Sequence, residues 1–478
     1  MKEILTLFCL ACLLLPVSAK DFNVIDYGAD TTCVSLSSDA INRAITACHE
    51  QGGGRVVLPR GRYLCGTLFL KSQVELRLER GAVISASTAY DDFPLQPRNH
   101  FRSQKDRDGW KALIFAADCH DIAITGEGTI EGNGGKRKTG LERVSKDKTR
   151  LPNNILLVSC RNIVVKGITV KDAPGWNQHY LNCERLTIEG ITSWNHCYSN
   201  NDGIDIDCCR KVTIRHCLVD SDDDGIVLKS TGPIPCEDIR IDHCIVSSFA
   251  NAIKCGTESV GGFRHITITD CTVLPSAHKG KRVVNTTPTG ITALSLEMVD
   301  GGILENVNVK GLDIVGTECP IYIRLANRGR NAIDGLATAP AVPGVLRDVT
   351  ISHVKVSEAG TFGSSITGIV SKCAERIVLK DVHVESRGGL KAGCYRHPGD
   401  DNGVRHDIAG NNHPDQYWAS ADQVAEDDST YPQPTQWGNL PCHGLFVRHV
   451  RGLKMKNVTF STKLPDPRQA VIQVDVRP

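Results

Sequence analysis

Short segments in which apolar and polar residues alternate recur along this chain at a nearly constant spacing. Such segments begin at Val212, Ile239 and Ile266, each 27 residues after the last, and earlier ones at Ile163 and Leu186 fit the same frame. Weaker echoes follow at wider intervals and begin at Ile303, Leu346, Ile377 and Leu453. Alternation with period two predicts β-strands, and a repeat of this size predicts strands stacked as the coils of a solenoid.

Two other repeat architectures fit less well. A β-propeller would need blades of roughly 40 residues, and a leucine-rich horseshoe would need its Leu and Asn signature. The repeats of this chain have neither feature. The pattern therefore predicts an all-β, single-domain right-handed parallel β-helix.

The chain is long for one domain, but a solenoid escapes the usual size limit because each coil contacts only its neighbours. Aromatic residues make up only 5% of the 478 residues, as expected for thin coils filled with Val, Ile and Leu, and no Pro- or Ser-rich linker divides the chain. We expect one domain over residues 20–478. The repeat breaks over about residues 391–441, where turn-forming residues predict a long irregular loop.

The N-terminal part of the chain, before the first coil, contains two recognisable features. Residues 1–19 combine Lys2, an apolar run and a small-residue cleavage site, which predicts a signal peptide and a secreted or periplasmic protein without a membrane span. Lipid attachment at Cys12 is the alternative. Apolar residues at helical spacing over 40–48, ended by Gly52, predict a helix that caps the open end of the first coil.

Composition limits the partners and cofactors. The balance of 55 basic and 54 acidic residues argues against nucleic-acid binding. The cysteines Cys217, Cys244 and Cys271 recur at one position of the repeat, which favours a buried column of mostly unpaired thiols over disulfides. Without paired Cys-x-x-Cys motifs the chain gives no zinc signature, and we expect no metal and no cofactor. We also expect a monomer.

Aspartates gather at one place in the repeat. Asp202 and Asp224 are 22 residues apart, so they belong to adjacent coils and would stack roughly 4.8 Å apart. Carboxylates forced together repel, which raises at least one pKa and suits a general acid beside a general base. Consecutive Asp223 and Asp224 would face opposite sides of a regular strand, so the backbone must bend near Gly225 if both are to reach the same face. A solvated turn and a calcium loop are the alternatives, the second weakened by Thr231 at the position of the bidentate Glu.

Four motifs occur along the chain in this order: Ile130–Gly134, Pro174–His179, Asn200–Gly203 and Asp223–Asp224. In sequence and order they resemble the motifs of family 28 of the glycoside hydrolases, the polygalacturonases and rhamnogalacturonan hydrolases. The resemblance extends from about Phe22 to about Asp270, and more loosely to the C-terminus. The family's first acidic motif is Asn-Thr-Asp, so Asn201 is a variant.

The resemblance implies roles for three acids. Asp223 would be the general acid that protonates the glycosidic oxygen, and Asp202 and Asp224 would together hold and deprotonate the attacking water. A water between acid and base implies inversion of the anomeric centre.

The chain departs from the family at two motifs. The family's Gly-His-Gly is replaced here around Asn251, and its Arg-Ile-Lys, which grips the substrate carboxylate, is absent from the sequence. We therefore expect other residues to contact the substrate, with cations replacing the missing grip. These expected substrate-binding residues are His179, Asn200, Lys229, Asn251, Lys254 and Arg324.

The expected function is that of a secreted, inverting hydrolase of pectic polysaccharide or oligosaccharide, cutting next to galacturonic acid. If the 391–441 loop blocks one end of the cleft, the enzyme would act from chain ends. Three alternatives stay open: a non-catalytic carbohydrate-binding β-helix, a neutral-sugar glycosidase and a polysaccharide lyase on the same scaffold.

Overall fold

A computed structural model of the chain describes residues 20–96, 100–104, 110–136, 152–197, 200–278, 289–330, 342–390, 418 and 420–478. The predicted signal peptide, residues 1–19, lies outside the described residues. So does most of the predicted irregular loop, of which residues 418 and 420–441 are described.

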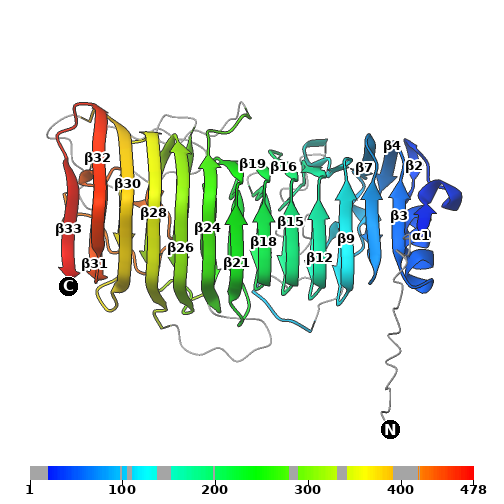
Figure 1. Cartoon of the computed structure of the whole chain (residues 1–478), viewed down its shortest axis with the longest axis horizontal. Helices are drawn as coiled ribbons and strands as arrows, with labels where there is room; N and C mark the ends of the chain where they lie inside the picture. Colours follow the sequence, from blue (N-terminus) through cyan, green and yellow to red (C-terminus); the bar gives the residue numbers. More distant parts are fainter. Residues whose placement is uncertain are drawn as a thin grey trace, which may run out of the picture.

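The molecule is an elongated parallel β-helix with the helix α1 at one end and the C-terminal strand at the other (Figure 1). Strands of successive coils pair in parallel and form three long sheets. The predicted all-β parallel β-helix is confirmed.

The first sheet begins where β1 (Asp21–Asn23) pairs with β3. Its strands are β3 (Gly54–Leu58), β6 (Val74–Leu78), β9 (His120–Gly126), β12 (Arg161–Lys166), β15 (Glu184–Glu189), β18 (Arg210–Arg215), β21 (Cys236–Asp242), β24 (Gly262–Val273), β26 (Ile303–Val315), β28 (Val345–Ala359), β30 (Ala374–Gly388) and β32 (Lys454–Leu464). The second sheet contains β2 (Thr32–Leu36), β4 (Gly61–Cys65), β7 (Ala82–Ala86), β10 (Thr129–Glu131), β13 (Thr169–Lys171), β16 (Thr192–Asn195), β19 (Leu218–Ser221) and β22 (Ile245–Ser248). From β24 onward the long strands serve both sheets, since β24 pairs with β21 and with β22.

The third sheet carries the predicted site. Its strands are β5 (Leu68–Phe69), β8 (Ala112–Ala117), β11 (Asn153–Val158), β14 (Gln178–Leu181), β17 (Ile204–Asp207), β20 (Ile226–Ser230), β23 (Asn251–Ser259), β25 (Gly290–Met298), β27 (Thr317–Leu325), β29 (Ser364–Thr367), β31 (Cys442–Arg451) and β33 (Gln469–Arg477). Short 3-10 helices add η1 (Val24–Tyr27), η2 (Tyr90–Asp92), η3 (Gly134–Lys136) and η5 (Pro434–Gln436).

The predicted repeat is confirmed over the central coils, where Val212 pairs with Ile239 and Ile239 with Ile266. Two of the later echoes were misaligned, whereas Ile377 is in register with Val349. In the first case Val307, not Ile303, pairs with Ile266. Likewise Val349, not Leu346, pairs with Val307. The reason is that β24, β26 and β28 run on through the corner between two sheets, so alternation alone does not mark the register there.

Apolar side chains fill the interior of the coils as stacked columns. Beneath the third sheet, one column runs through Ile204, Ile226, Ile253, Leu294 and Ile321, which pair in order and are all buried. Each such side chain contributes roughly 1.5–3 kcal/mol by leaving water. Because the column is continuous, the polar residues beside it are held at a fixed spacing.

The capping helix was predicted correctly. Helix α1 (Ser38–Glu50) buries Ile41, Ala44, Ile45 and Cys48 against the first coil. It thereby covers apolar interior that the end coil would otherwise expose.

The column of thiols was also predicted correctly. Cys217, Cys244 and Cys271 are buried, and the cysteines within the described part of the chain are unpaired.

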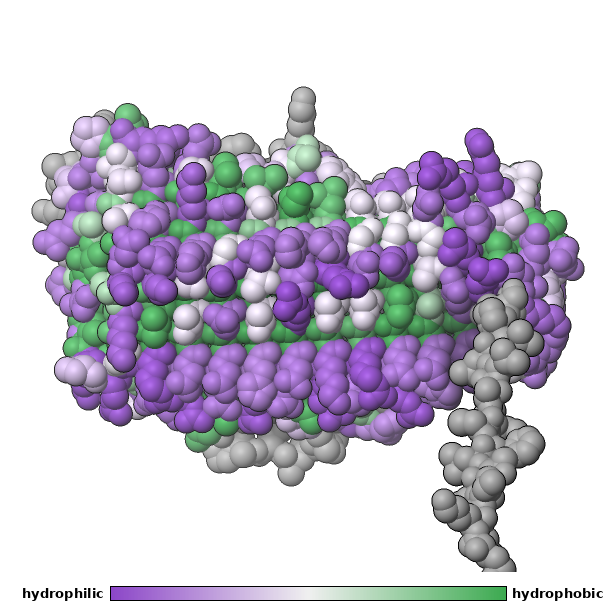
Figure 2. Space-filling model, in the orientation of Figure 1, coloured by the Kyte–Doolittle hydropathy of each residue, from purple (hydrophilic) through white to green (hydrophobic). Residues whose placement is uncertain are grey.

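The stacking of equivalent positions also explains the pattern of the surface, where residues of like polarity form bands along the long axis (Figure 2). Within the described residues, no helix is long and apolar enough to cross a membrane.

Candidate active site

Asp202, Asp224 and Asn251 occupy the same position in three successive coils, just before or at the start of β17, β20 and β23. The backbone N–H of Gly203 donates to the Asp224 carbonyl (2.8 Å), and that of Gly225 donates to the Asn251 carbonyl (2.8 Å). The predicted stacking of Asp202 on Asp224 is therefore confirmed, and Asn251 extends the stack by one coil.

Asp223 and Asp224 lie in a bend between β19 and β20, as predicted. Ser221 and Ser248 hold the bend by donating from their hydroxyls to the Asp223 carbonyl, at 2.8 and 2.6 Å. Gly225 is required for a reason the sequence did not indicate. A Cβ atom there would lie 2.5 Å from the Ala252 carbonyl oxygen of the next coil, so glycine allows the coils to approach.

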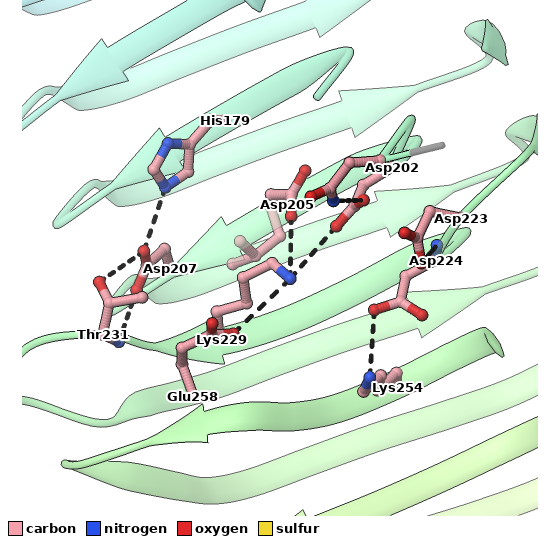
Figure 3. A network of polar contacts seen from close by, with 12 residues as sticks. His179, Asp202, Asp205, Asp207, Asp223, Asp224, Lys229, Thr231, Lys254 and Glu258 are labelled. Carbon is pink, nitrogen blue, oxygen red and sulfur yellow. Dashed lines mark hydrogen bonds and ion pairs between the residues drawn. The ribbon is translucent and has the colours of Figure 1, made fainter. Parts of the chain in front are cut away.

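Lys229 lies among three carboxylates. Its Nζ is 3.2 Å from Asp202 Oδ2, 3.4 Å from Asp205 Oδ1 and 3.8 Å from Glu258 Oε2. Figure 3 shows the ammonium reaching between Asp202 and Asp205. Burial alone lowers the pKa of Lys229, but the surrounding carboxylates outweigh it and raise that pKa well above its usual value.

Burial acts in the opposite direction on the two aspartates. It raises the pKa of Asp202, although Lys229 opposes the rise. Burial and the neighbouring Asp202 raise the pKa of Asp205 further, well above its ordinary value. The site thus holds buried carboxyl groups whose protonation is not that of free aspartates in water.

Lys254, one coil further on, likewise lies between carboxylates. Its Nζ lies 3.3 Å from Asp224 Oδ2 and 3.8 Å from Glu297 Oε2. Asn251 donates to the other oxygen of Asp224 (2.6 Å) and accepts from the Thr292 hydroxyl (2.7 Å). Asp224 is therefore held at both oxygens, as Figure 3 shows for its contact with Lys254. Burial raises the pKa of Glu297 to about 7.

Asn200 and Asn201 differ in what they hold. The exposed Asn200 donates to Asp202 Oδ1 (3.2 Å). The buried Asn201 accepts from the Cys197 N–H and donates to the Ala173 and Gly175 carbonyls, so it fixes the local backbone.

His179 does not reach the carboxylates of the site. Its Nε2 lies 3.1 Å from Asp207 Oδ2, and its ring packs edge-on against Trp110 and Trp176. In Figure 3 it points away from Asp202 towards Asp207, which also accepts from Thr231. Since His179 is 0% exposed, its burial does not support the expected direct contact with substrate.

Arg324 is also fully buried, which does not support the expected contact with substrate. Its guanidinium donates to the Thr367 hydroxyl (3.2 Å) and the Gly368 carbonyl (3.1 Å). It also donates to the Glu426 and Asp427 carbonyls of the irregular loop. Alternation along β27 did put Arg324 outside the coil interior, but the loop covers it there. Its contacts give it a structural role as the anchor of that loop.

The predicted substrate-binding lysines are almost as buried. Lys229 is 5% exposed and Lys254 is 1% exposed, and both already contact acids. Their position favours control of the carboxylates over a direct grip on substrate.

Four polar members of this site were not predicted from the sequence: Asp205, Glu258, Glu297 and Tyr431. One signal was available for the first, since Asp205 and Asp207 alternate with buried isoleucines along β17 and so point away from the interior. Tyr431 had none, because it comes from the irregular loop, 177 residues from Lys254, and its hydroxyl lies 3.4 Å from Lys254 Nζ.

Two aromatic rings flank the lysines. Trp176 lies in the coil before Asp202, and the centre of its ring is 4.6 Å from Lys229 Nζ. The centre of the Tyr431 ring is 5.6 Å from Lys254 Nζ. Trp176 is half-buried and Tyr431 is exposed. Aromatic faces are suitable platforms for the apolar faces of sugar rings.

A polar hollow elsewhere on the surface does not compete with this site. A shallow hollow on the first sheet is lined by Arg55, Asp121, Asn162 and Arg185, but Arg55 is paired with Asp21 and Arg185 donates to Asn162. Within the described residues, no group of three or more His, Cys, Asp or Glu side chains is placed to hold a metal ion.

The fold and the site together define a parallel β-helix with an acidic site on one sheet, in which buried lysines accompany stacked aspartates. A model of glycosyl hydrolases family 28 matches residues 48–398. The chain belongs to this family.

Sequence identity to individual relatives is low. A probable polygalacturonase of Vitis vinifera is 28% identical over 313 residues, which cover 62% of this chain and 60% of that protein. The chain therefore matches about three fifths of the length of that relative.

Solved structures share the fold. The family 28 exopolygalacturonase of Yersinia enterocolitica aligns over 96% of this chain and 78% of its own, with a TM-score of 0.70 and 18% identity. The surface adhesin PfbA of Streptococcus pneumoniae aligns over 95% of this chain and all of its own, with a TM-score of 0.56 and 13% identity. The β-helix alone thus does not separate a hydrolase from an adhesin.

Proposed function

We propose that residues 20–478 form one catalytic domain that hydrolyses glycosidic bonds of pectic polysaccharide or oligosaccharide, inverting the anomeric centre. The observation that carries this proposal is the stack of Asp202 on Asp224, with Asp223 beside them in the same bend. Membership in glycosyl hydrolases family 28 supports it.

Asp223 is assigned the role of general acid. It is half-buried, its Oδ1 accepts from the Asp224 N–H (3.0 Å), and two serine hydroxyls hold its backbone. A proton donor must keep one orientation while the leaving oxygen develops charge. The rigid bend satisfies that requirement.

Asp202 and Asp224 are assigned to the attacking water. Each has one oxygen near a buried lysine, so the lysine restrains the carboxylate while the remaining lone pairs can accept from a water. The raised pKa of Asp202 brings it closer to the pH at which a base works best.

Two features support galacturonic acid as the substrate unit and action at chain ends, and a third feature supports export. The relative from Vitis vinifera is named a probable polygalacturonase, and the similar Yersinia enterocolitica structure is an exopolygalacturonase. The described part of the irregular loop brings Tyr431 to Lys254, which limits the space on one side of Asp224. The predicted signal peptide at residues 1–19 supports export.

The similarity to an adhesin structure favours keeping one alternative, a non-catalytic carbohydrate-binding β-helix. The test is to incubate the purified protein with a panel of pectic polymers and oligosaccharides and to separate the products by chromatography. Wild type should release galacturonate-containing products. Asp223→Asn should fold normally, and its rate of hydrolysis should be about 10²–10⁴-fold lower, because asparagine cannot supply an acidic proton.

Three other outcomes would contradict the proposal. Retention of more than about a tenth of the rate by Asp223→Asn would remove Asp223 from the role of acid. Unsaturated products absorbing in the ultraviolet would identify a lyase. Saccharide binding without any hydrolysis, unchanged by Asp223→Asn, would favour the non-catalytic alternative.

A further inference from the structure

The three cations that were expected to bind substrate already contact groups of the protein itself. Lys229 lies within 3.8 Å of three carboxylates and Lys254 within 3.8 Å of two. Arg324 is fully buried and donates to four groups. A substrate carboxylate would have to displace these contacts in order to bind any of the three.

Arg328 is different. Among the residues the structure describes, no carboxylate lies within ion-pair distance of its guanidinium, whereas the neighbouring Arg330 is paired with Glu258 at 3.3 Å. Its Nη1 is buried and has no hydrogen-bond partner within that part of the chain. A half-buried guanidinium has lost part of its hydration, and such a loss is normally offset by an anion.

The position of Arg328 links it to the proposed site. Its guanidinium carbon lies 4.7 Å from the centre of the Tyr431 ring, and the Tyr431 hydroxyl lies 3.4 Å from Lys254 Nζ. Lys254 in turn lies 3.3 Å from Asp224. Arg328 and Asp224 are therefore joined through only two intervening side chains.

The backbone that carries Arg328 is held on both sides. The Asn327 N–H donates to the Asp428 carbonyl (2.7 Å), and the Gly329 N–H donates to the Val299 carbonyl (3.1 Å). The arginine is thus presented from a fixed segment, which reduces the entropy lost when a ligand binds.

We infer that Arg328, stacked on Tyr431, binds the carboxylate of a uronic acid unit in the subsite next to Asp224. This inference rests on the proposed function. Arg328 would supply the cation that the missing Arg-Ile-Lys motif would otherwise provide. A guanidinium forms two parallel charge-assisted hydrogen bonds to a carboxylate, and the 46%-exposed Tyr431 offers its ring to the sugar.

The test compares Arg328→Met and Arg328→Lys with wild type on free-acid and fully methyl-esterified galacturonate oligomers. We expect Arg328→Met to lower kcat/KM on the free acid by about ten- to a hundredfold, mainly through KM, and to change the esterified substrate little. Arg328→Lys should fall between, since an ammonium keeps the charge but not the paired geometry. Arg215→Met is the matched control, because Arg215 lies on the first sheet and is paired with Glu189.

Titration calorimetry with a galacturonate dimer separates failure of this inference from failure of the proposed function. If wild type binds the dimer, Arg328→Met binds it at least tenfold more weakly and no hydrolysis occurs, the carboxylate site stands and the hydrolase proposal fails. Equal binding by wild type and Arg328→Met, equal losses on both substrates, or no binding by wild type would each overturn the inference. Circular dichroism of each variant verifies that the β-helix is intact.

Discussion

Replacing Lys254 with methionine would leave two buried carboxylates, Asp224 and Glu297, without the ammonium that lies between them. The distances are 3.3 and 3.8 Å, and the three side chains are at most 5% exposed. At an effective dielectric constant of about 20, each contact corresponds to about 4–5 kcal/mol of attraction, before the cost of desolvation. Removing one partner of a buried pair costs about 3–5 kcal/mol overall, and we expect that loss of stability.

The loss should depend on pH because Glu297 can escape by binding a proton. Its pKa is about 7 with Lys254 present, and Lys254 acts to lower it. Well below pH 7 Glu297 is neutral in both proteins, so the variant loses mainly the contact with Asp224. Above pH 7 it loses both contacts, and Lys254→Met should be destabilised more at pH 8 than at pH 5.

Urea unfolding at pH 5 and pH 8 measures this difference, with kcat/KM determined on free-acid and methyl-esterified substrates. Activity should fall on both substrates, because the disturbed group is Asp224. The double variant Lys254→Met, Glu297→Gln should recover part of the stability at pH 8. The control Lys166→Met removes an exposed lysine paired with Glu189 (3.2 Å) and should change stability by less than about 1 kcal/mol.

One result would refute this reasoning. If Lys254→Met unfolds like wild type at both pH values and loses activity only on the free acid, Lys254 grips the substrate carboxylate. That result would restore the expectation drawn from the sequence and would leave Arg328 without its proposed role.

Two further predictions test the chemistry and the electrostatics separately. Proton NMR in the first minutes of reaction should show the inverted anomer as the initial product, and a retained anomer or a trapped glycosyl-enzyme would contradict the roles of Asp202, Asp223 and Asp224. For Glu297, the pKa of about 7 in the folded protein exceeds its ordinary value of 4.5, so its contribution to stability is present below pH 4.5 and is lost as pH rises through 7. Relative to Glu297→Gln, wild type should therefore lose up to about 3 kcal/mol between pH 4.5 and pH 8, measured by urea unfolding, and parallel curves would refute that assignment.

The sequence by itself determined the coil repeat, the capping helix, the thiol column and the stacking of Asp202 on Asp224. These features are local or periodic: a fixed spacing with alternating apolar residues brings equivalent positions of successive coils together, whatever the loops do. The bend at Asp223 also followed, because consecutive residues of a strand face opposite sides.

Only the tertiary structure decided what the cations do. The sequence predicted that Lys229 and Lys254 bind substrate, yet both contact acids from other coils: Asp202, Glu258 and Glu297. Arg324 is covered by a loop about 100 residues away, and Arg328 stacks on a tyrosine from the same loop. Charge pairing depends on distances of a few ångströms between distant segments, and the strand period carries no information about where an irregular loop returns to the sheet.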